Sequence, residues 1–507
     1  MSLLEEMPRV DQPPAVALPE LLEPVATYDD EVPELRMFVD GEWRGAVSGE
    51  RFDVRSPIDG SLIARAQLGG TEDVEAAISA ARRARGAIRA MSAAERLATC
   101  ERAAGIMRDH LDAFVQTIVV DLGKTMASAE SEVTTTIQRL ELVREEVRRI
   151  FGEYLPGDWV AGTEGKRGVV IREPVGTVAA IGPFNYPLFT PAAKIIPALA
   201  AGNAVVAKAP SDDPVALLMF ARVLEQAGFP PGALNVVTGP GSKIGDLLAS
   251  HPDISMVSFT GSATAGRKLA EAAGPKPLHL ELGGNAAGLV LADADLEQAV
   301  EKTVAASFKN AGQRCSALSR ILVVDAVYDR YVEAAVEEAR SWTLGDPRAD
   351  GVDVGPLVHE DAAETVQGLV QDARDRGARL LLGGDREGCY HQPTVLADVS
   401  FAAELSCEET FGPVLTIVHV DDEQQAIEQA NASRYGLDSA VFTRDLETAW
   451  RVASALEVGM VAVNDAPSHG VGHFPFGGRK PDSGVGREGL GYSIDECTAL
   501  KTVVLPG

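Results

Sequence analysis

Two short stretches hold residue types that could perform acyl chemistry. Glu281 precedes the double glycine Gly283-Gly284, and Cys315 follows among small and amide-bearing residues. A thiol adds to a carbonyl only as the thiolate, and the resulting thioester is cleared by an activated water. A carboxylate that a glycine-bounded turn holds near the sulfur is a suitable base for that water. Taken alone, each residue is more typical of a buried structural cysteine or a solvated glutamate.

Other candidate residues follow apolar segments that read as strands. The stretch 256–266 reads as strand, glycine turn and helix, which lets backbone N–H groups approach a pyrophosphate, although it is neither a P-loop nor G-x-G-x-x-G. Lys208 ends an apolar strand where ligands bind in open sheets, or it is a snorkelling surface lysine. Asn185 could stabilise an oxyanion, or only form a turn beside proline. The stretch 408–413 could be a solvated loop.

Composition limits the class of protein. A chain of 507 residues predicts two or three domains, and a net charge of -28 makes nucleic acid and membrane poor partners. The acidic surface indicates either general solubility or a high-salt, halophilic cytoplasm. The 5 cysteines are far apart and match neither a disulfide framework nor a metal site. With no apparent leader and no apolar stretch long enough to cross a bilayer, we expect a soluble cytoplasmic protein.

The first part of the chain predicts an arm, short strands and helices. Residues 1–35 are acidic and proline-rich, and we expect a loose arm or strap that buries little. A hairpin at Asp40-Gly41 is predicted next. Amphipathic spacing then predicts helices over 73–89, 93–122 and 127–151.

Alternating strands and helices fill the rest of the chain. From 175 to 273 and again from 284 to 464 the alternation is typical of a parallel sheet wrapped by helices. Before these two stretches, residues 161–172 read as a β-hairpin. After them, residues 498–504 read as an isolated terminal strand. Such a strand usually pairs with a distant segment.

The order of motifs supports a resemblance. From about residue 37 to 504 the chain contains, in order, FNYP, the strand-end lysine, FTGS, LELGG, GQRC, EETFGPV, FPFGGRK and SGVGREG. This set resembles the aldehyde dehydrogenase superfamily. Longer stretches, YLPGDW, GPFNYPLF, YGLDSAVF and VNDAPSHGVGHFPFGGRK, are similar to the archaeal branch of non-phosphorylating glyceraldehyde-3-phosphate dehydrogenases.

The resemblance implies an α/β aldehyde dehydrogenase-like fold. A Rossmann-type dinucleotide-binding domain would span 36–155 and 175–283, and an αβα catalytic domain 284–485. The flexible arm would be 1–35. An oligomerisation module, made of the hairpin 156–174 and the tail 486–507, would form a homodimer or homotetramer.

The resemblance also assigns roles to residues. Cys315 would attack the aldehyde, Asn185 with the Cys315 backbone N–H would hold the oxyanion, and Glu281 would activate water. NADP, NAD or both would be the cofactor, because the neutral Ser211 leaves room for a 2′-phosphate that Lys208 could pair with. The implied cofactor-binding residues are Phe184, Lys208, Ser211, Gly241, Phe259, Gly261, Ser262, Gly266, Leu282, Glu409 and Phe411.

The substrate implied is a small aldehyde, with glyceraldehyde 3-phosphate oxidised irreversibly to 3-phosphoglycerate as the main hypothesis. Tyr186, Arg314 and His469 would bind its tail. Thr135 and His469 stand where bacterial members have arginine, which weakens the phosphate hypothesis. The alternative is an unphosphorylated aldehyde such as glyceraldehyde, lactaldehyde or a semialdehyde. A non-catalytic binding protein is a remote alternative, because Cys315 and Glu281 are both present.

Overall fold

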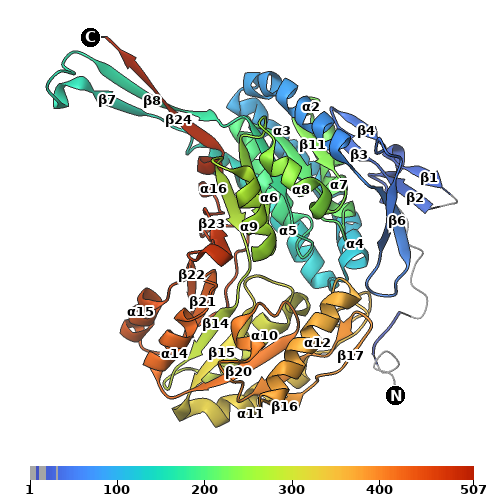
Figure 1. The fold of residues 1–507 in the computed structure, drawn as a ribbon, viewed down its shortest axis with the longest axis vertical. Helices are drawn as coiled ribbons and strands as arrows, with labels where there is room; N and C mark the ends of the chain where they lie inside the picture. The colour runs from blue at the N-terminus through green and yellow to red at the C-terminus, as the bar shows by residue number, and fades with distance from the viewer. Residues whose placement is uncertain (1–6, 11–18, 30–31, 507) are drawn as a thin grey trace.

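Two large sheets, each wrapped by helices, carry most of the chain in the computed structural model (Figure 1). The structure describes residues 7–10, 19–29 and 32–506. Within this part, the first sheet has 8 strands in the order β23-β13-β12-β9-β10-β11-β3-β4, and the second has 7 in the order β16-β19-β20-β15-β14-β21-β22. This is the parallel, helix-wrapped architecture that the sequence predicts. The domain boundaries predicted from the sequence remain an interpretation.

The centre of the first sheet is parallel and fully buried. Its strands are near-continuous apolar runs because helices cover both of its faces. They are β9 (Thr177–Ile181), β10 (Ala204–Lys208), β11 (Leu234–Val237), β12 (Met256–Thr260) and β13 (Leu278–Glu281). The helices around them are α2 (Thr71–Ala90), α3 (Ala93–Asp109), α4 (Leu111–Leu122), α5 (Met126–Val147), α6 (Phe189–Ala201), α7 (Val215–Ala227), α8 (Gly241–Ser250) and α9 (Ala263–Ala273).

One predicted helix is two. The sequence predicts a single helix over 93–122, but the backbone leaves helical geometry at His110, with φ -115° and ψ 20°. The chain then starts again as α4. No glycine or proline marks this break, and the amphipathic pattern continues through it. The sequence therefore gives no signal for the break.

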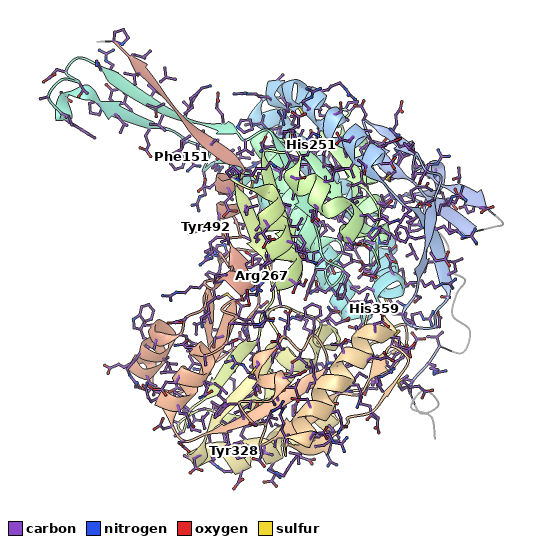
Figure 2. All side chains as sticks on the ribbon, viewed as in Figure 1. Phe151, His251, Arg267, Tyr328, His359 and Tyr492 are labelled. Atoms are coloured by element: carbon purple, nitrogen blue, oxygen red, sulfur yellow. The ribbon has the colours of Figure 1, made fainter. Side chains whose placement is uncertain are left out.

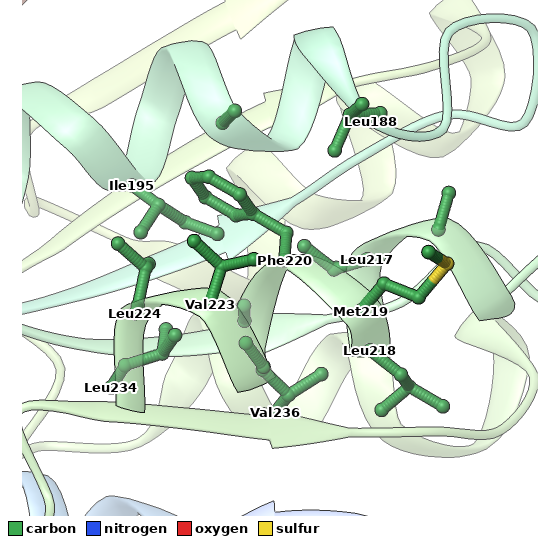
Figure 3. Close-up of a cluster of buried hydrophobic side chains, with 14 of the residues drawn as sticks. Leu188, Ile195, Leu217, Leu218, Met219, Phe220, Val223, Leu224, Leu234 and Val236 are labelled. Atoms are coloured by element: carbon green, nitrogen blue, oxygen red, sulfur yellow. The ribbon is translucent and has the colours of Figure 1, made fainter. Parts of the chain in front are cut away.

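Apolar contacts hold the helices on the first sheet. Phe220 on α7 is fully buried and lies among Ile195 of α6 and Leu234 and Val236 of β11 (Figure 3). Burying one such side chain stabilises a fold by about 1.5–3 kcal/mol. This packing fixes α6 and α7 against β11 and thereby the ends of the neighbouring strands.

The second sheet is also mainly parallel, with β16 antiparallel at one edge. Its strands are β14 (Ala286–Val290), β15 (Leu318–Val324), β16 (Arg379–Leu382), β19 (Thr394–Ala397), β20 (Val414–Val420), β21 (Asp438–Phe442) and β22 (Met460–Val463). Its helices are α10 (Leu296–Phe308), α11 (Tyr328–Arg340), α12 (Glu360–Asp375), α13 (Glu404–Cys407), α14 (Glu423–Asn431) and α15 (Leu446–Ala455). A short pair, β17 (Arg386–Glu387) and β18 (Tyr390–His391), lies outside it. The strand β23 (Gly484–Val485) extends the first sheet by pairing with β13.

A three-stranded antiparallel arm projects from the body (Figure 1). It consists of β7 (Glu153–Pro156), β8 (Arg167–Pro174) and the terminal β24 (Thr498–Leu505), which follows α16 (Tyr492–Glu496). The predicted hairpin span of 161–172 is wrong at its start. Gly162 and Gly165 lie in the connection between strands, with left-handed backbones, and the first strand is β7. The prediction that the terminal strand pairs with a distant segment is confirmed, since β24 pairs with β8 along its length.

The amino-terminal residues bury more than the sequence predicts. Leu21 and Leu22 are buried, and β1 (Thr27–Asp29) and β2 (Val32–Leu35) join β5 (Arg51–Arg55) and β6 (Leu62–Gln67) in a sheet of four strands. The expectation of a loose arm is therefore wrong for residues 19–29 and 32–35. Residues 1–6, 11–18 and 30–31, also in that expectation, lie outside the described residues.

The next hairpin follows the prediction. Its strands are β3 (Met37–Val39) and β4 (Glu42–Arg44), and both Asp40 and Gly41 have positive φ, as a two-residue hairpin turn requires. In the described part of the chain, no helix has the length and apolar character that crossing a membrane requires.

Two carboxyl groups, Asp121 and Asp213, are buried beside α7. Burial raises the pKa of both well above the usual range, and for Asp213 the charge of Asp121 adds to this effect. The folded protein therefore holds a proton that the unfolded chain releases at about pH 4. The stabilisation is fully present below that pH and is lost as the pH rises through the folded pKa.

Asp213→Asn removes this ionisation without changing the size of the side chain. We expect it to raise the melting temperature above about pH 7 by about 2–4 °C for each kcal/mol of relief, and to change little near about pH 4. Thermal melts across this range measure the effect, with exposed Asp350→Asn as the control. A melting temperature at about pH 8 that is equal to or below that of the parent protein would contradict it.

Candidate active site

The strand order of the first sheet defines where a ligand would bind. The sequence β13-β12-β9-β10-β11 means that successive strands are added on one side of β9 and then, from β12, on the other. Open α/β sheets bind ligands at the carboxyl edge of such a reversal point. Phe184 and Asn185 follow β9, and Gly261 and Ser262 follow β12, so these four residues come from the two strands that flank the reversal.

Lys208, the last residue of β10, and Ser211 lie at the same edge. Lys208 Nζ lies 3.1 Å from Ser211 Oγ, and Ser211 Oγ donates to the Gly239 carbonyl at 3.3 Å. Burial lowers the pKa of Lys208 to about 8, although Asp212 and Asp213 oppose the shift. A buried ammonium beside a neutral hydroxyl is suited to an incoming anion.

The turn from β12 into α9 exposes backbone rather than side chains. A Cβ on Gly261 would lie 2.4 Å from Phe259 Cζ, and one on Gly266 would lie 2.3 Å from Leu282 Cδ2. A Cβ at either position would therefore displace the Phe259 ring or the Leu282 side chain. Ser262 caps α9, accepting the Ala265 N–H at 3.3 Å. A bare turn at a helix N-terminus fits a dinucleotide pyrophosphate.

An unusual backbone run sets the position of Cys315. Asn310, Ala311 and Gly312 all have left-handed φ values, of 58°, 52° and 70°, which ends α10 two residues earlier than the sequence predicts. Asn310 and Ala311, as non-glycine residues in this region, are strained and persist only where the surroundings enforce them. One such restraint is Asn185, whose Nδ2 donates to the Gln313 carbonyl at 2.7 Å.

The double glycine lies directly against the cysteine. A Cβ on Gly284 would lie 2.2 Å from the Cys315 carbonyl oxygen, and one on Gly283 would lie 2.8 Å from Glu409 Oε2. The Gly284 N–H donates to Glu409 Oε1 at 2.9 Å, and burial raises the pKa of Glu409 to about 7. Three stretches that are distant in sequence therefore meet here.

Aromatic rings lie nearby. Phe411 has a positive φ of 48°, and its ring contacts that of Phe184 edge-on, with centroids 5.7 Å apart. The cofactor-binding residues predicted from the sequence, including Gly241 at the start of α8, are thus distributed along one edge and its facing loop.

One pocket contains all the predicted catalytic and substrate residues. Burial, with the charges of Asp438, Glu409 and Glu281, raises the pKa of the Cys315 thiol above its ordinary value. The resting group is therefore a thiol, and its proton must leave as the sulfur attacks. The pocket is lined by Asn185, Tyr186, Glu281, Arg314, Cys315 and His469, together with Ser128, Ser131, Glu132, Thr135, Phe189, Thr190, Thr260, Lys309, Ser316, Ser468, Gly470, Phe476 and Glu488.

Glu281 is suited to accept a proton. Burial raises the pKa of its carboxyl group, and the neighbouring His279 opposes that shift. Among the described residues, neither carboxylate oxygen has a hydrogen-bond partner, although Oε1 lies 3.4 Å from His279 Nε2. A buried carboxylate without donors is a stronger base than a solvated one.

The predicted substrate residues are present but partly engaged by the protein. The Arg314 guanidinium donates to Ser316 Oγ and to the Pro467 carbonyl, both at 3.1 Å. His469 stacks on Phe476, and its Nε2 lies 2.8 Å from Asp438 Oδ2. Although burial disfavours the charged imidazole, Asp438 raises the pKa of His469.

Lys309 is a pocket residue that the sequence analysis missed. Partial burial lowers its pKa, as do the nearby cations Arg314 and Lys124. Lys124 itself is buried, with its Nζ 3.6 Å from the Tyr186 ring centroid and bonded to Glu132. The sequence contains no signal for Lys309, because the left-handed run that follows it was not predictable at Ala311.

The chain belongs to the aldehyde dehydrogenase family, whose family model matches residues 43–503. It is 40% identical over 469 residues to the NADP(+) succinate-semialdehyde dehydrogenase of Escherichia coli (strain K12), covering 91% of this chain and 96% of the relative. It is 36% identical over 472 residues to the NADP-dependent glyceraldehyde-3-phosphate dehydrogenase of Streptococcus equinus, covering 93% and 98%. The crystal structure of the NADP-dependent glyceraldehyde-3-phosphate dehydrogenase from Bacillus halodurans C-125, complexed with NADP, superposes with a TM-score of 0.91 at 38% identity, covering 93% and 99%.

These comparisons confirm the predicted α/β aldehyde dehydrogenase fold, the oxidoreductase class and NAD or NADP as the cofactor. They do not separate the substrates, because relatives named for different aldehydes match to similar extents. The archaeal assignment stays a prediction.

Gly284→Ala should displace the Cys315 backbone, because its Cβ has no room beside that carbonyl. We expect kcat for aldehyde oxidation to fall by about 100-fold or more, as reacting groups shift by an ångström. Gly86→Ala is the control, since a Cβ there meets nothing within 4 Å, and it should keep activity. Normal turnover by a folded Gly284→Ala protein would contradict the stated contact.

Proposed function

We propose that this protein oxidises a small aldehyde with an anionic tail to its carboxylic acid, using NADP or NAD, through a thioester on Cys315. Glyceraldehyde 3-phosphate, giving 3-phosphoglycerate, is the first candidate substrate. The observation that carries the proposal is one pocket holding Cys315, Glu281 and Asn185 together with the cations Lys309 and Arg314.

The residues would act in sequence. Cys315 Sγ bonds to the aldehyde carbon as its proton passes to solvent water, while Asn185 Nδ2 and the Cys315 N–H hold the oxygen. The dinucleotide, when bound, supplies the acceptor for the hydride that leaves this carbon, and a thioester remains. Glu281 takes a proton from water, the water oxygen bonds to the acyl carbon, and the carbon–sulfur bond breaks to release the acid.

NADP acceptance is supported by the pair Lys208 and Ser211. Ser211 carries no charge to repel a 2′-phosphate, and the Lys208 ammonium lies 3.1 Å from its hydroxyl. We therefore expect Ser211→Glu to lower kcat/KM for NADP by about tenfold or more and to affect NAD much less. Steady-state kinetics with both dinucleotides test this, with exposed Ser250→Glu as the control. Equal losses with the two cofactors would contradict the assignment.

A second candidate class is an unphosphorylated small aldehyde, such as glyceraldehyde, lactaldehyde or a semialdehyde. Thr135 adds no charge to the pocket, and Arg314 and His469 are already engaged by protein groups. With few cations free in the pocket, a substrate tail that ends in a carboxylate or a hydroxyl group fits it as well as a phosphate does. The semialdehyde enzyme among the relatives supports this alternative.

A substrate panel separates these candidates. If a phosphate binds at Lys309 and Arg314, Lys309→Ala and Arg314→Ala should each lower kcat/KM for glyceraldehyde 3-phosphate by about tenfold, and leave plain glyceraldehyde nearly unchanged. Lys302→Ala, on the solvent side of α10, is the matched control.

Two results would contradict the phosphate assignment or the hydrolytic route. Equal kcat/KM for phosphorylated and plain glyceraldehyde would exclude phosphate recognition. Turnover only with added phosphate or coenzyme A would exclude hydrolysis by Glu281. A protein inert towards every aldehyde would revive the non-catalytic alternative.

Assembly into a homodimer or homotetramer is proposed from the arm. Trp159 is 73% exposed, and Leu500 and Val504 on β24 are 62% and 63% exposed. Phe151 and Tyr492 lie at the base of the arm (Figure 2). Bare strand edges with apolar side chains favour pairing with another chain. Light scattering that finds a monomer would contradict this.

A cytoplasmic location is proposed from the cysteines. All five are free, although the structure buries only Cys100 and Cys497, as expected in a reducing compartment. Adaptation to high salt is proposed from the net charge of -28. Running the substrate panel at several salt concentrations tests this adaptation, since activity that is highest at low salt would contradict it.

A further inference from the structure

A buried histidine lies behind the proposed base. His279 is two residues before Glu281 on β13, so both side chains point to the same face of the sheet. Its exposed fraction is 3%. His279 Nε2 lies 3.4 Å from Glu281 Oε1 and 3.7 Å from Glu488 Oε2, and Nδ1 is in short contact with Glu496 Oε2. One imidazole therefore faces three carboxylates.

Few other charges balance these carboxylates. From α6, Lys194 Nζ lies 3.0 Å from Glu488 Oε2. Glu496, from α16, is the only one of the three with a substantially exposed side chain, at 27%. If His279 were neutral, Lys194 would be the only cation among the described residues in ion-pair contact with any of the three carboxylates. Buried anions without partners are costly, so the cluster favours the imidazolium.

Further groups around the cluster act on its members rather than on His279 directly. The Arg487 backbone N–H donates to Glu496 Oε1 at 2.8 Å. On α5, Arg139 is buried with Glu146 and also acts on Glu488. The thiol of Cys497 lines the small cavity beside His279.

We infer that His279, as an imidazolium, positions the Glu281 carboxylate for water activation. This rests on the role proposed above for Glu281. The glycine at 477 leaves the space that Glu281 occupies, since a Cβ there would lie 2.8 Å from Glu281 Oε1. His279 is a positioning residue, because it acts through Glu281 and does not line the pocket that contains Cys315.

The electrostatics give the direction of the effect. Burial disfavours charge on His279, but the carboxylates of Glu281 and Glu496, which face its two ring nitrogens, raise its pKa to about 9. At neutral pH the ring is therefore charged, and it opposes the rise that burial causes in the pKa of Glu281. Loss of that charge raises the pKa of Glu281 further, so the base form disappears at a higher pH than in the parent protein.

The test uses p-nitrophenyl acetate, an activated ester that acylates a thiol without a dinucleotide. The initial burst of p-nitrophenol reports acylation of Cys315, and the steady phase reports hydrolysis of the acyl-enzyme. His279→Gln keeps a donor near the Nε2 position but removes the charge. We expect the burst to be unchanged. In the pH profile of the steady-phase rate, the acid limb should move up by about one pH unit, so that the rate below that limb falls about tenfold.

A matched control is His251→Gln, another histidine paired with a glutamate, Glu75, at 3.1 Å. Glu496→Gln is the second variant, because its partly exposed side chain tolerates change, and it should move the limb in the same direction by less. An acid limb unchanged in folded His279→Gln overturns the inference. If His279→Gln does not fold, an unchanged limb in Glu496→Gln overturns it.

Glu281→Gln separates this inference from the proposed function. If that variant hydrolyses the acyl-enzyme normally, the role of Glu281 itself is wrong. If it stops hydrolysis while His279→Gln keeps the parent pH profile, only the inference about His279 fails. A merely structural His279 would lower the melting temperature and leave the pH profile in place.

Discussion

The contact between Gly284 and the Cys315 carbonyl is the constraint on which the rest of the site depends. Any side chain at 284 would enter that carbonyl, with a Cβ only 2.2 Å away. Because β13 ends just before this turn and β14 begins just after it, the same two glycines connect the two sheets. The cysteine of one sheet is thereby held at the carboxyl edge of the other, where the residues proposed to bind the dinucleotide lie.

The site is stabilised by its surroundings rather than by its own groups. Removal from water raises the pKa of Cys315, Glu281 and Glu409. Two successive non-glycine residues with left-handed backbones, Asn310 and Ala311, add strain. Unfavourable local features of this kind persist because the hydrophobic cores around the two sheets hold the chain in place, and they are typical of functional sites.

Much of this arrangement was predictable from the sequence, because alternating elements determine a parallel sheet and strand ends determine an edge. Lys208 and Asn185 were located in this way, and Glu281 was located by the double glycine that follows it. The break at His110 was not predictable, since the amphipathic pattern continues across it. Lys309 and His279 were missed for a similar reason: their importance comes from residues distant in sequence, such as Lys124 or Glu496, that only the folded chain brings near.

The most direct test of the central claim is the mass of the enzyme quenched during turnover with aldehyde and NADP, followed by peptide mapping. The account predicts an acyl group on Cys315 alone, which accumulates when Glu281 is replaced by glutamine. Turnover without any adduct on Cys315, or with an adduct on another cysteine such as the exposed Cys407, would contradict it.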